Sequence, residues 1–235
     1  MLLTNKRILL TGATSGIGRC LAVKLAAAGA QLAICGLSSQ KMDALMKEFG
    51  SSNQTIYSKT FSVTDETEII RFVNEAKIKF GGIDILINCA GLNSARGNIA
   101  EIKTSDLDYM ISVNLRAPFI FMREVFNIMK ENKSGIVVNV LSTVCLFANE
   151  GIGAYTASKA GIDALTKVFR KEARKEGVKV CGVYPGGVNT TFRNTERPDY
   201  MSPKSIADAI IAMIVLPDDV AVHDLILRPM VEENF

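Results

Sequence analysis

Three side chains in the middle of the chain have the types and the spacing needed to move a proton to or from an oxygen atom. Ser142 follows an apolar run, 136–141, and Tyr155 and Lys159 lie four positions apart downstream of it. On a helix, residues four apart share one face, so the phenol and the ammonium would be neighbours. A nearby cation favours the phenolate and lowers the pKa of a phenol, which is ordinarily about 10. Such a phenol could give a proton to a carbonyl oxygen or take one from an alcohol.

The same two residues also have a plainer interpretation, because helices often carry a Tyr/Lys pair on their surface. Taken alone, the stretch 142–159 favours that interpretation. The choice therefore depends on which elements surround the stretch and on what else they bring to the same place.

The composition favours one large domain and excludes several functional classes. The chain has 235 residues, of which 48% are hydrophobic, and a formal net charge of +3. Its length suits a single α/β domain, 1–235, and the mild charge without dense runs argues against nucleic-acid binding. Five scattered cysteines without a CxxC pattern indicate reduced thiols in a cytoplasmic protein. His223 is the only histidine and has no cysteine near it, so no metal site is expected.

No segment of the sequence predicts a membrane association. The first residues meet Gly12 too early to hold a secretory apolar region. The most apolar helix candidate, 206–216, is interrupted by Asp208 and is too short to span a bilayer.

Short apolar runs alternate along the chain with longer segments of helical character. The runs predicted as strands are 7–11, 31–35, 55–61, 83–87, 135–141, 178–184 and 224–227. The segments predicted as helices are 19–28, 41–49, 66–80, 105–129, a helix through Tyr155 to about 175, and 205–216. This alternation, with runs rich in Val and Ile, predicts a doubly wound, mostly parallel seven-stranded sheet with helices on both faces, a Rossmann-like α/β fold.

The first predicted strand is followed by a glycine-rich turn, 11–18, with the sequence TGATSGIG. Gly12 permits a tight turn, Gly16 lets the backbone approach a pyrophosphate, and Gly18 lets the next helix pack on the strand. The free N–H groups and the dipole of that helix would attract the anion. A purely structural turn is the alternative, but the position directly after a first strand favours phosphate binding.

Candidate residues also follow other predicted strands at their carboxyl ends. Gly12, Asn88, Ser142 and Pro185 each lie just past a strand end. Ligands of a parallel α/β sheet bind beyond the carboxyl ends of its strands. We therefore expect these positions to meet at one site, which reverses the initial preference for a surface Tyr/Lys pair.

Taken together, these motifs resemble the short-chain dehydrogenase/reductase family over 6–229. The glycine turn TGxxxGxG of the family matches 11–18, and its NNAG element matches 88–91, with Cys89 in place of the second Asn. Its PGxVxT segment matches 185–190. Its catalytic Asn-Ser-Tyr-Lys group matches Asn114, Ser142, Tyr155 and Lys159.

The resemblance implies an NAD(P)(H)-dependent oxidoreductase that transfers a hydride between nicotinamide and a carbonyl or secondary alcohol. Tyr155 would be the acid/base, and Ser142 would hydrogen-bond the substrate oxygen. Lys159 would lower the pKa of Tyr155 and hold the nicotinamide ribose, while Asn114 would hold a water in a proton path to Lys159. The residues implied in cofactor binding are Gly12, Thr14, Ser15, Gly16, Ile17, Gly18, Gly36, Leu37, Ser38, Ser62, Val63, Asn88, Ala90, Gly91, Tyr155, Lys159, Pro185, Gly186, Val188 and Thr190.

Two departures from the family pattern concern the cofactor. Ser62 stands where the family commonly has an Asp before the Val that contacts adenine. The second predicted strand ends without an acidic residue before Asp43, whereas NAD-using members place one there for the ribose hydroxyls. A 2′-phosphate would meet no carboxylate, and Ser15, Ser38, Ser39 or Lys41 could hydrogen-bond it. NADP(H) is therefore expected rather than NAD(H).

The expected substrate is a small-molecule carbonyl or alcohol: a 3-oxoacyl compound, a hydroxy acid or a small ketone. A polar segment, 190–204, follows the sixth strand and is expected to be a substrate loop, with an ordinary surface loop as the alternative. Family members often form homodimers or homotetramers through their long helices. The apolar positions Phe119, Phe126 and Leu165 allow this here, although burial within one subunit would explain them equally well.

Two other functions remain as alternatives. A non-catalytic NADP(H)-binding regulatory or scaffold protein would be expected to lose Tyr155 or Lys159, and this chain keeps both. A nucleotide-sugar epimerase of the extended branch usually has a TGxxGxxG turn and a longer chain. A P-loop kinase is excluded because no Lys-Ser/Thr follows the glycines.

Overall fold

The structure, a computed structural model, describes residues 3–50, 55–192 and 195–233. Its centre is a seven-stranded sheet with the order β3-β2-β1-β4-β5-β6-β7, in which every neighbouring pair is parallel. The strands are β1 (Arg7–Thr11), β2 (Gln31–Gly36), β3 (Ile56–Thr60), β4 (Ile85–Asn88), β5 (Gly135–Val140), β6 (Val178–Pro185) and β7 (Asp224–Leu227). The doubly wound fold is confirmed, and the sheet is wholly parallel where a mostly parallel one was predicted.

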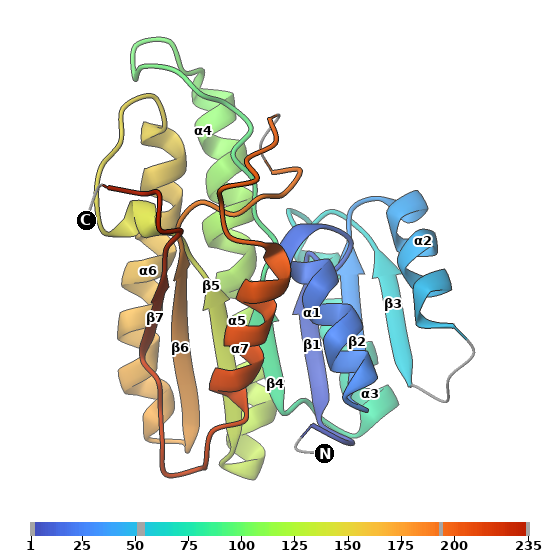
Figure 1. The fold of residues 1–235 in the computed structure, drawn as a ribbon. Helices are drawn as coiled ribbons and strands as arrows, with labels where there is room; N and C mark the ends of the chain where they lie inside the picture. The colour runs from blue at the N-terminus through green and yellow to red at the C-terminus, as the bar shows by residue number, and fades with distance from the viewer. Residues whose placement is uncertain (1–2, 51–54, 193–194, 234–235) are drawn as a thin grey trace.

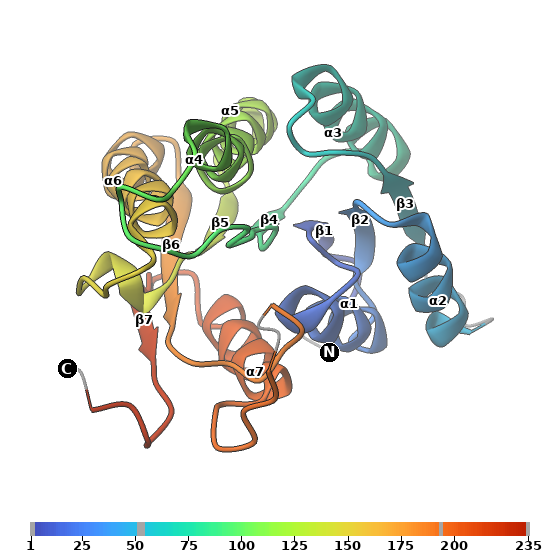
Figure 2. The same ribbon diagram turned by 90° about the horizontal axis from the view of Figure 1, so that it is seen from above.

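Helices cover both faces of the sheet, as the view from above shows (Figure 2). They are α1 (Gly16–Ala27), α2 (Ser39–Phe49), α3 (Glu66–Phe80), α4 (Thr104–Ile111), α5 (Ala117–Met129), α6 (Gly153–Arg174) and α7 (Pro203–Ile214). One hydrophobic core joins α1, α2 and α7 to one face of the sheet, and a second joins α3, α5 and α6 to the other. In the part of the chain that is described, no helix has the length and apolar character that crossing a bilayer requires.

The strand order places a binding site at one edge of the sheet. The order reverses between β1 and β4, because β2 and β3 extend to one side and β5 to β7 to the other. At such a switch point the loops that follow the two central strands diverge and leave a crevice. Figure 1 shows this carboxyl edge at the top, with segments 89–103, 186–192 and 195–202 above it.

The single long helix predicted over 105–129 is wrong in its middle. A turn of π-helix, Ser112–Arg116, separates α4 from α5, and the Ala117 N–H donates to the carbonyl of Ser112, five residues back. Proline has no N–H, so Pro118 cannot supply the donor that a regular α-helix would direct at the carbonyl of Asn114. Turns of this kind occur often at functional sites.

Candidate active site

A cavity of about 840 Å³ lies at the carboxyl edge of the sheet, where β1, β4, β5 and β6 end. Its wall combines the glycine turn, the loop after β4, the Ser142 segment, the start of α6 and the turn after β6. The sequence-predicted site residues in this wall are Gly12, Ser15, Gly16, Ile17, Gly18, Ala90, Gly91, Ser142, Tyr155, Lys159, Pro185, Gly186, Val188 and Thr190. Segments far apart in the sequence therefore meet at one place.

The glycine turn is shaped by positive φ angles and by close backbone contacts. Gly12 and Gly16 have φ angles of +68° and +50°, a region that favours glycine. A Cβ on Gly12 would come within 2.8 Å of the Ala90 nitrogen, and one on Gly18 would collide with the Gly12 carbonyl. The Ser15 side chain does not cap α1, so the first N–H groups of α1 remain available to an anion.

The hydroxyl of Thr11 holds this turn against the loop after β4. It accepts hydrogen bonds from the backbone nitrogens of Cys89 at 3.1 Å and Ala90 at 3.0 Å. This role was missed, although Thr11 begins the glycine motif. Burial raises the pKa of the Cys89 thiol to about 12, so the residue that replaces the family asparagine is a neutral thiol.

Ser142, Tyr155 and Lys159 share the wall of the cavity and are each more than nine-tenths buried. Lys159 donates from Nζ to the carbonyl of Val140 at 2.9 Å, and burial lowers the pKa of its ammonium. The Ser142 hydroxyl accepts from the Val144 nitrogen at 3.3 Å. A phenol, a hydroxyl and a buried amine therefore line the same cavity.

Asn114 lies behind this group rather than in the cavity wall. Its side chain accepts from the Leu92 nitrogen at 2.9 Å and donates to the Leu92 carbonyl at 2.8 Å and to Ser158 Oγ at 2.9 Å. A Cβ on Gly91 would come 3.3 Å from both Asn114 Oδ1 and Lys159 Nζ. Asn114 thus joins the loop after β4 to α6, and only a glycine fits without strain between it and Lys159.

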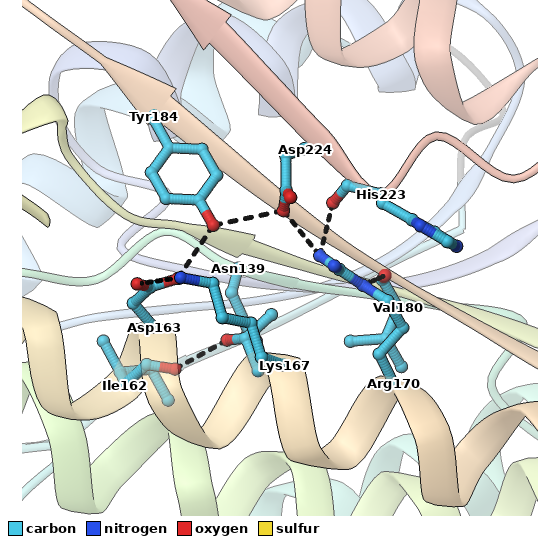
Figure 3. A network of polar contacts seen from close by, with 10 residues as sticks. Asn139, Ile162, Asp163, Lys167, Arg170, Val180, Tyr184, His223 and Asp224 are labelled. Carbon is cyan, nitrogen blue, oxygen red and sulfur yellow. Dashed lines mark hydrogen bonds and ion pairs between the residues drawn. The ribbon is translucent and has the colours of Figure 1, made fainter. Parts of the chain in front are cut away.

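A polar network anchors α6, the helix of Tyr155 and Lys159, to the last two strands (Figure 3). The Tyr184 hydroxyl donates to Asp163 at 2.8 Å and lies 3.1 Å from the Asp224 carboxylate. Arg170 pairs with Asp224 at 2.6 Å. Burial, helped by both carboxylates, raises the pKa of Tyr184, so its hydroxyl stays protonated and acts as a donor.

Several predicted cofactor residues lie outside the cavity wall, at or just after the carboxyl ends of β1, β2, β3 and β4. Asn88 donates to Asn139 at 2.9 Å within the core. The Ser62 hydroxyl contacts that of Thr64 at 2.8 Å. The other members of this group are Thr14, Gly36, Leu37, Ser38 and Val63.

The end of β2 determines what an adenosine ribose would meet. Leu37 is 68% exposed, and the Ser38 hydroxyl caps α2 by accepting from the Lys41 nitrogen at 3.3 Å. The first turn of α2 contains no acidic residue, and Lys41 lies in the cavity wall. The end of β2 therefore places the N-terminus of α2 and the Lys41 side chain where they could attract a negatively charged group.

The segment after β6 contributes Val188, Thr190, Thr191, Phe192 and Tyr200 to the cavity wall, and a β-bridge joins Val188 to Met201. The Phe192 ring lies 5.9 Å from the Tyr155 ring, centroid to centroid. Part of the predicted loop, 193–194, lies outside the described residues. The sequence did not single out Phe192, because an aromatic residue in a polar loop has no periodic signature.

Other wall residues that sequence reasoning missed include Asn93, Tyr200 and Glu232. Glu232 comes from the last residues of the chain, which no motif covers. His223, the only histidine, is not part of the cavity wall, and no cluster of metal-ligating side chains occurs among residues 3–50, 55–192 and 195–233. The described cysteines are unpaired thiols, and only two of the five are fully buried.

Comparisons with known proteins find a family and relatives that match most of this chain. Residues 6–201 match the protein family described as short chain dehydrogenase. An uncharacterized oxidoreductase of Staphylococcus aureus is 29% identical over 231 residues, which cover 97% of this chain and 99% of that protein. A 3-oxoacyl-[acyl-carrier-protein] reductase of Thermotoga maritima is 32% identical over 222 residues, covering 94% of this chain and 89% of the reductase.

Solved structures give the same result for the fold. The alcohol dehydrogenase of the archaeon Thermococcus sibiricus, complexed with 5-hydroxy-NADP, superimposes with a TM-score of 0.90. The two chains are 25% identical, and the match covers 97% of each.

Proposed function

This chain belongs to the short-chain dehydrogenase family, and on that premise we propose that it transfers a hydride between NADP(H) and a small carbonyl or secondary alcohol. The observation that carries the proposal is the shared cavity of Ser142, Tyr155 and Lys159, placed against a glycine turn suited to a pyrophosphate. The alternative of a surface Tyr/Lys pair fails, because both side chains are buried at the cavity.

The residues at the carboxyl edge fit a dinucleotide. The uncapped start of α1, at Gly16, would hold the pyrophosphate, and Lys159 would hold the nicotinamide ribose. The turn with Val188 and Thr190 would hold the carboxamide. The nicotinamide, when bound, supplies the hydride acceptor or donor.

The protein itself would supply the proton. Tyr155 would give its phenolic proton to the carbonyl oxygen in reduction and take it from the alcohol in oxidation. Ser142 would hydrogen-bond the same oxygen and so hold it beside the phenol. The Lys159 ammonium would favour the phenolate, and an ammonium acts more strongly where water is excluded.

Asn114 would hold a water in a proton path to Lys159, and its existing hydrogen bonds limit which of its atoms can do so. Both N–H donors of its amide are used by Leu92 and Ser158, and Oδ1 already accepts one bond. A water would therefore have to use the second lone pair of Oδ1 or the backbone carbonyl of Asn114.

A preference for NADP(H) over NAD(H) is supported by the charges at the end of β2. A 2′-phosphate there would lie near the start of α2 and near Lys41, with no carboxylate in the first turn of that helix. The Thermococcus sibiricus relative, which was crystallised with an NADP derivative, is consistent with this preference.

For the substrate we propose a 3-oxoacyl compound, a hydroxy acid or a small ketone. The predicted substrate loop, 190–204, ends inside the first turn of α7, and its part before that helix would act on the substrate, because Phe192 reaches the ring of Tyr155. A homodimer or homotetramer in the cytoplasm completes the proposal. Phe119 and Val168, on α5 and α6, are 43% and 55% exposed and would be covered by a second copy, whereas Phe126 and Leu165 pack on the core.

The proposal is tested with a panel of carbonyls and alcohols, each supplied with NADPH or NADP and with NADH or NAD, while the absorbance of the reduced nicotinamide is followed. We expect turnover with at least one substrate class and lower KM for the phosphorylated cofactor. Cofactor binding without turnover on any substrate would favour the regulatory alternative, and a clear preference for NADH would overturn the cofactor assignment.

A further inference from the structure

The C-terminal segment after β7, 228–233, holds the turn that follows β6. The Gly186 nitrogen donates to the Leu227 carbonyl at 2.8 Å, which ends the β6–β7 ladder. The next nitrogen, that of Gly187, donates to Oε1 of Glu232 at 2.7 Å. Two successive N–H groups of the turn thus have acceptors, one in β7 and one in the segment 228–233.

Both glycines are in close contact with side chains. A Cβ on Gly186 would collide with the Glu232 carboxylate, and one on Gly187 would come 2.5 Å from the Tyr200 ring. The Glu232 side chain therefore packs against Gly186, and the Tyr200 ring packs against Gly187.

Glu232 also forms an ion pair with Arg228. The Arg228 guanidinium lies 3.7 Å from Oε2 of Glu232 and 4.0 Å from the centre of the Phe147 ring. Phe147 belongs to the loop that begins at Ser142. The segment 228–232 also forms a turn of its own, since the Glu232 nitrogen donates to the Pro229 carbonyl at 3.2 Å. One short segment thus joins the loop of Ser142 to the turn after β6.

We propose that Glu232 is a positioning residue that fixes the turn 185–188 in the conformation that receives the nicotinamide half of the cofactor. The proposal rests on the proposed function. Its physical basis is that a charged acceptor holds a backbone N–H more firmly than water does. Arg228 would act through Glu232 by holding its second oxygen.

The test compares the binding of intact NADP with the binding of its adenosine half, 2′,5′-ADP, by calorimetry. In Glu232→Ala the dissociation constant of NADP should rise about tenfold, the effect of losing one charge-assisted hydrogen bond. Binding of 2′,5′-ADP should not change, because its contacts lie on the glycine turn and α2. Glu232→Gln keeps an oxygen for Gly187 and should fall between Ala and the wild type.

Glu172→Ala is the matched control, since it removes the same charge at an exposed position of α6 outside the cavity wall, and it should bind NADP as the wild type does. In a double-mutant cycle, Arg228→Ala should add little to Glu232→Ala. Equal NADP affinity in the wild type, Glu232→Gln and Glu232→Ala would overturn the proposal, as would an equal loss for 2′,5′-ADP, which would mean general unfolding. Failure of the wild type to bind either ligand would instead overturn the proposed function.

Discussion

The ammonium of Lys159 donates to the carbonyl of Val140 at 2.9 Å, and this bond joins α6 to the end of β5. Val140 is the last residue of β5, two positions before Ser142. One hydrogen bond therefore fixes the helix that carries Tyr155 relative to the strand end that carries Ser142. The lysine that is proposed to tune the phenol thus also links the helix of Tyr155 to the strand that leads to Ser142.

Tyr155→Phe should abolish most turnover and leave the cofactor affinity nearly unchanged. The substitution removes the proton donor but keeps the ring that contacts Phe192. Loss of a general acid lowers kcat by about a hundredfold to ten-thousandfold. Steady-state kinetics and a fluorescence titration with NADPH measure the two quantities, and normal kcat in this variant would remove Tyr155 from the mechanism.

The free energy of unfolding should depend on pH through Lys159. Burial lowers the pKa of its ammonium from 10.5, so the unfolded chain binds this proton more tightly than the folded protein does. The cost of the buried charge is fully present below the folded pKa and is relieved as the pH rises from there to 10.5. The wild type should therefore gain stability relative to Lys159→Met over that range. Urea titrations at several pH values measure the difference, with the exposed Lys130→Met as the control, and a difference that does not change with pH would contradict the expectation.

Asn114→Ala should destabilise the protein by about 3 kcal/mol, because three hydrogen bonds are lost, and the buried Ser158 hydroxyl and the partly buried backbone groups of Leu92 lose a partner. Asn132→Ala, at an exposed position of the same type, should change stability by less than about 0.5 kcal/mol. Chemical denaturation compares the two. Similar effects in both variants would mean that the link between the loop after β4 and α6 contributes little.

Leu37→Asp should move cofactor preference toward NADH. The new carboxylate would lie where the end of β2 is now uncharged and would repel a 2′-phosphate, raising KM for NADPH about tenfold. Leu37→Asn, of the same size but without charge, should leave the preference as it is. Steady-state kinetics with NADPH and with NADH measure the preference of each variant. If the two substitutions changed KM for NADPH equally, the 2′-phosphate would not bind beside residue 37.

Tyr184→Phe should cost about 2 kcal/mol of stability, because the buried Asp163 carboxylate loses its hydroxyl donor. Tyr109→Phe, at a residue that is 41% exposed, is the matched control and should have little effect. Differential scanning calorimetry gives both values. If the two variants had the same melting temperature, the network in Figure 3 would not be what anchors α6.

Much of the fold was predictable because its signals are local. An apolar run such as 7–11 must be buried on both faces, and the glycines that follow it give the turn that a parallel strand needs before its helix. The spacing of Tyr155 and Lys159 likewise places them on one helix face whatever surrounds them. For this reason the alternation of strands and helices, and with it the doubly wound parallel sheet, followed from the sequence, whereas the order of the strands did not.

Only the tertiary structure shows the contacts between residues that no periodic sequence pattern connects. The bond from the Leu92 nitrogen to the Asn114 side chain joins residues 22 positions apart. The bond from Gly187 to Glu232 joins residues 45 positions apart. The free energy of such contacts comes from burial and hydrogen bonding in the folded chain, so it leaves no mark on the local sequence.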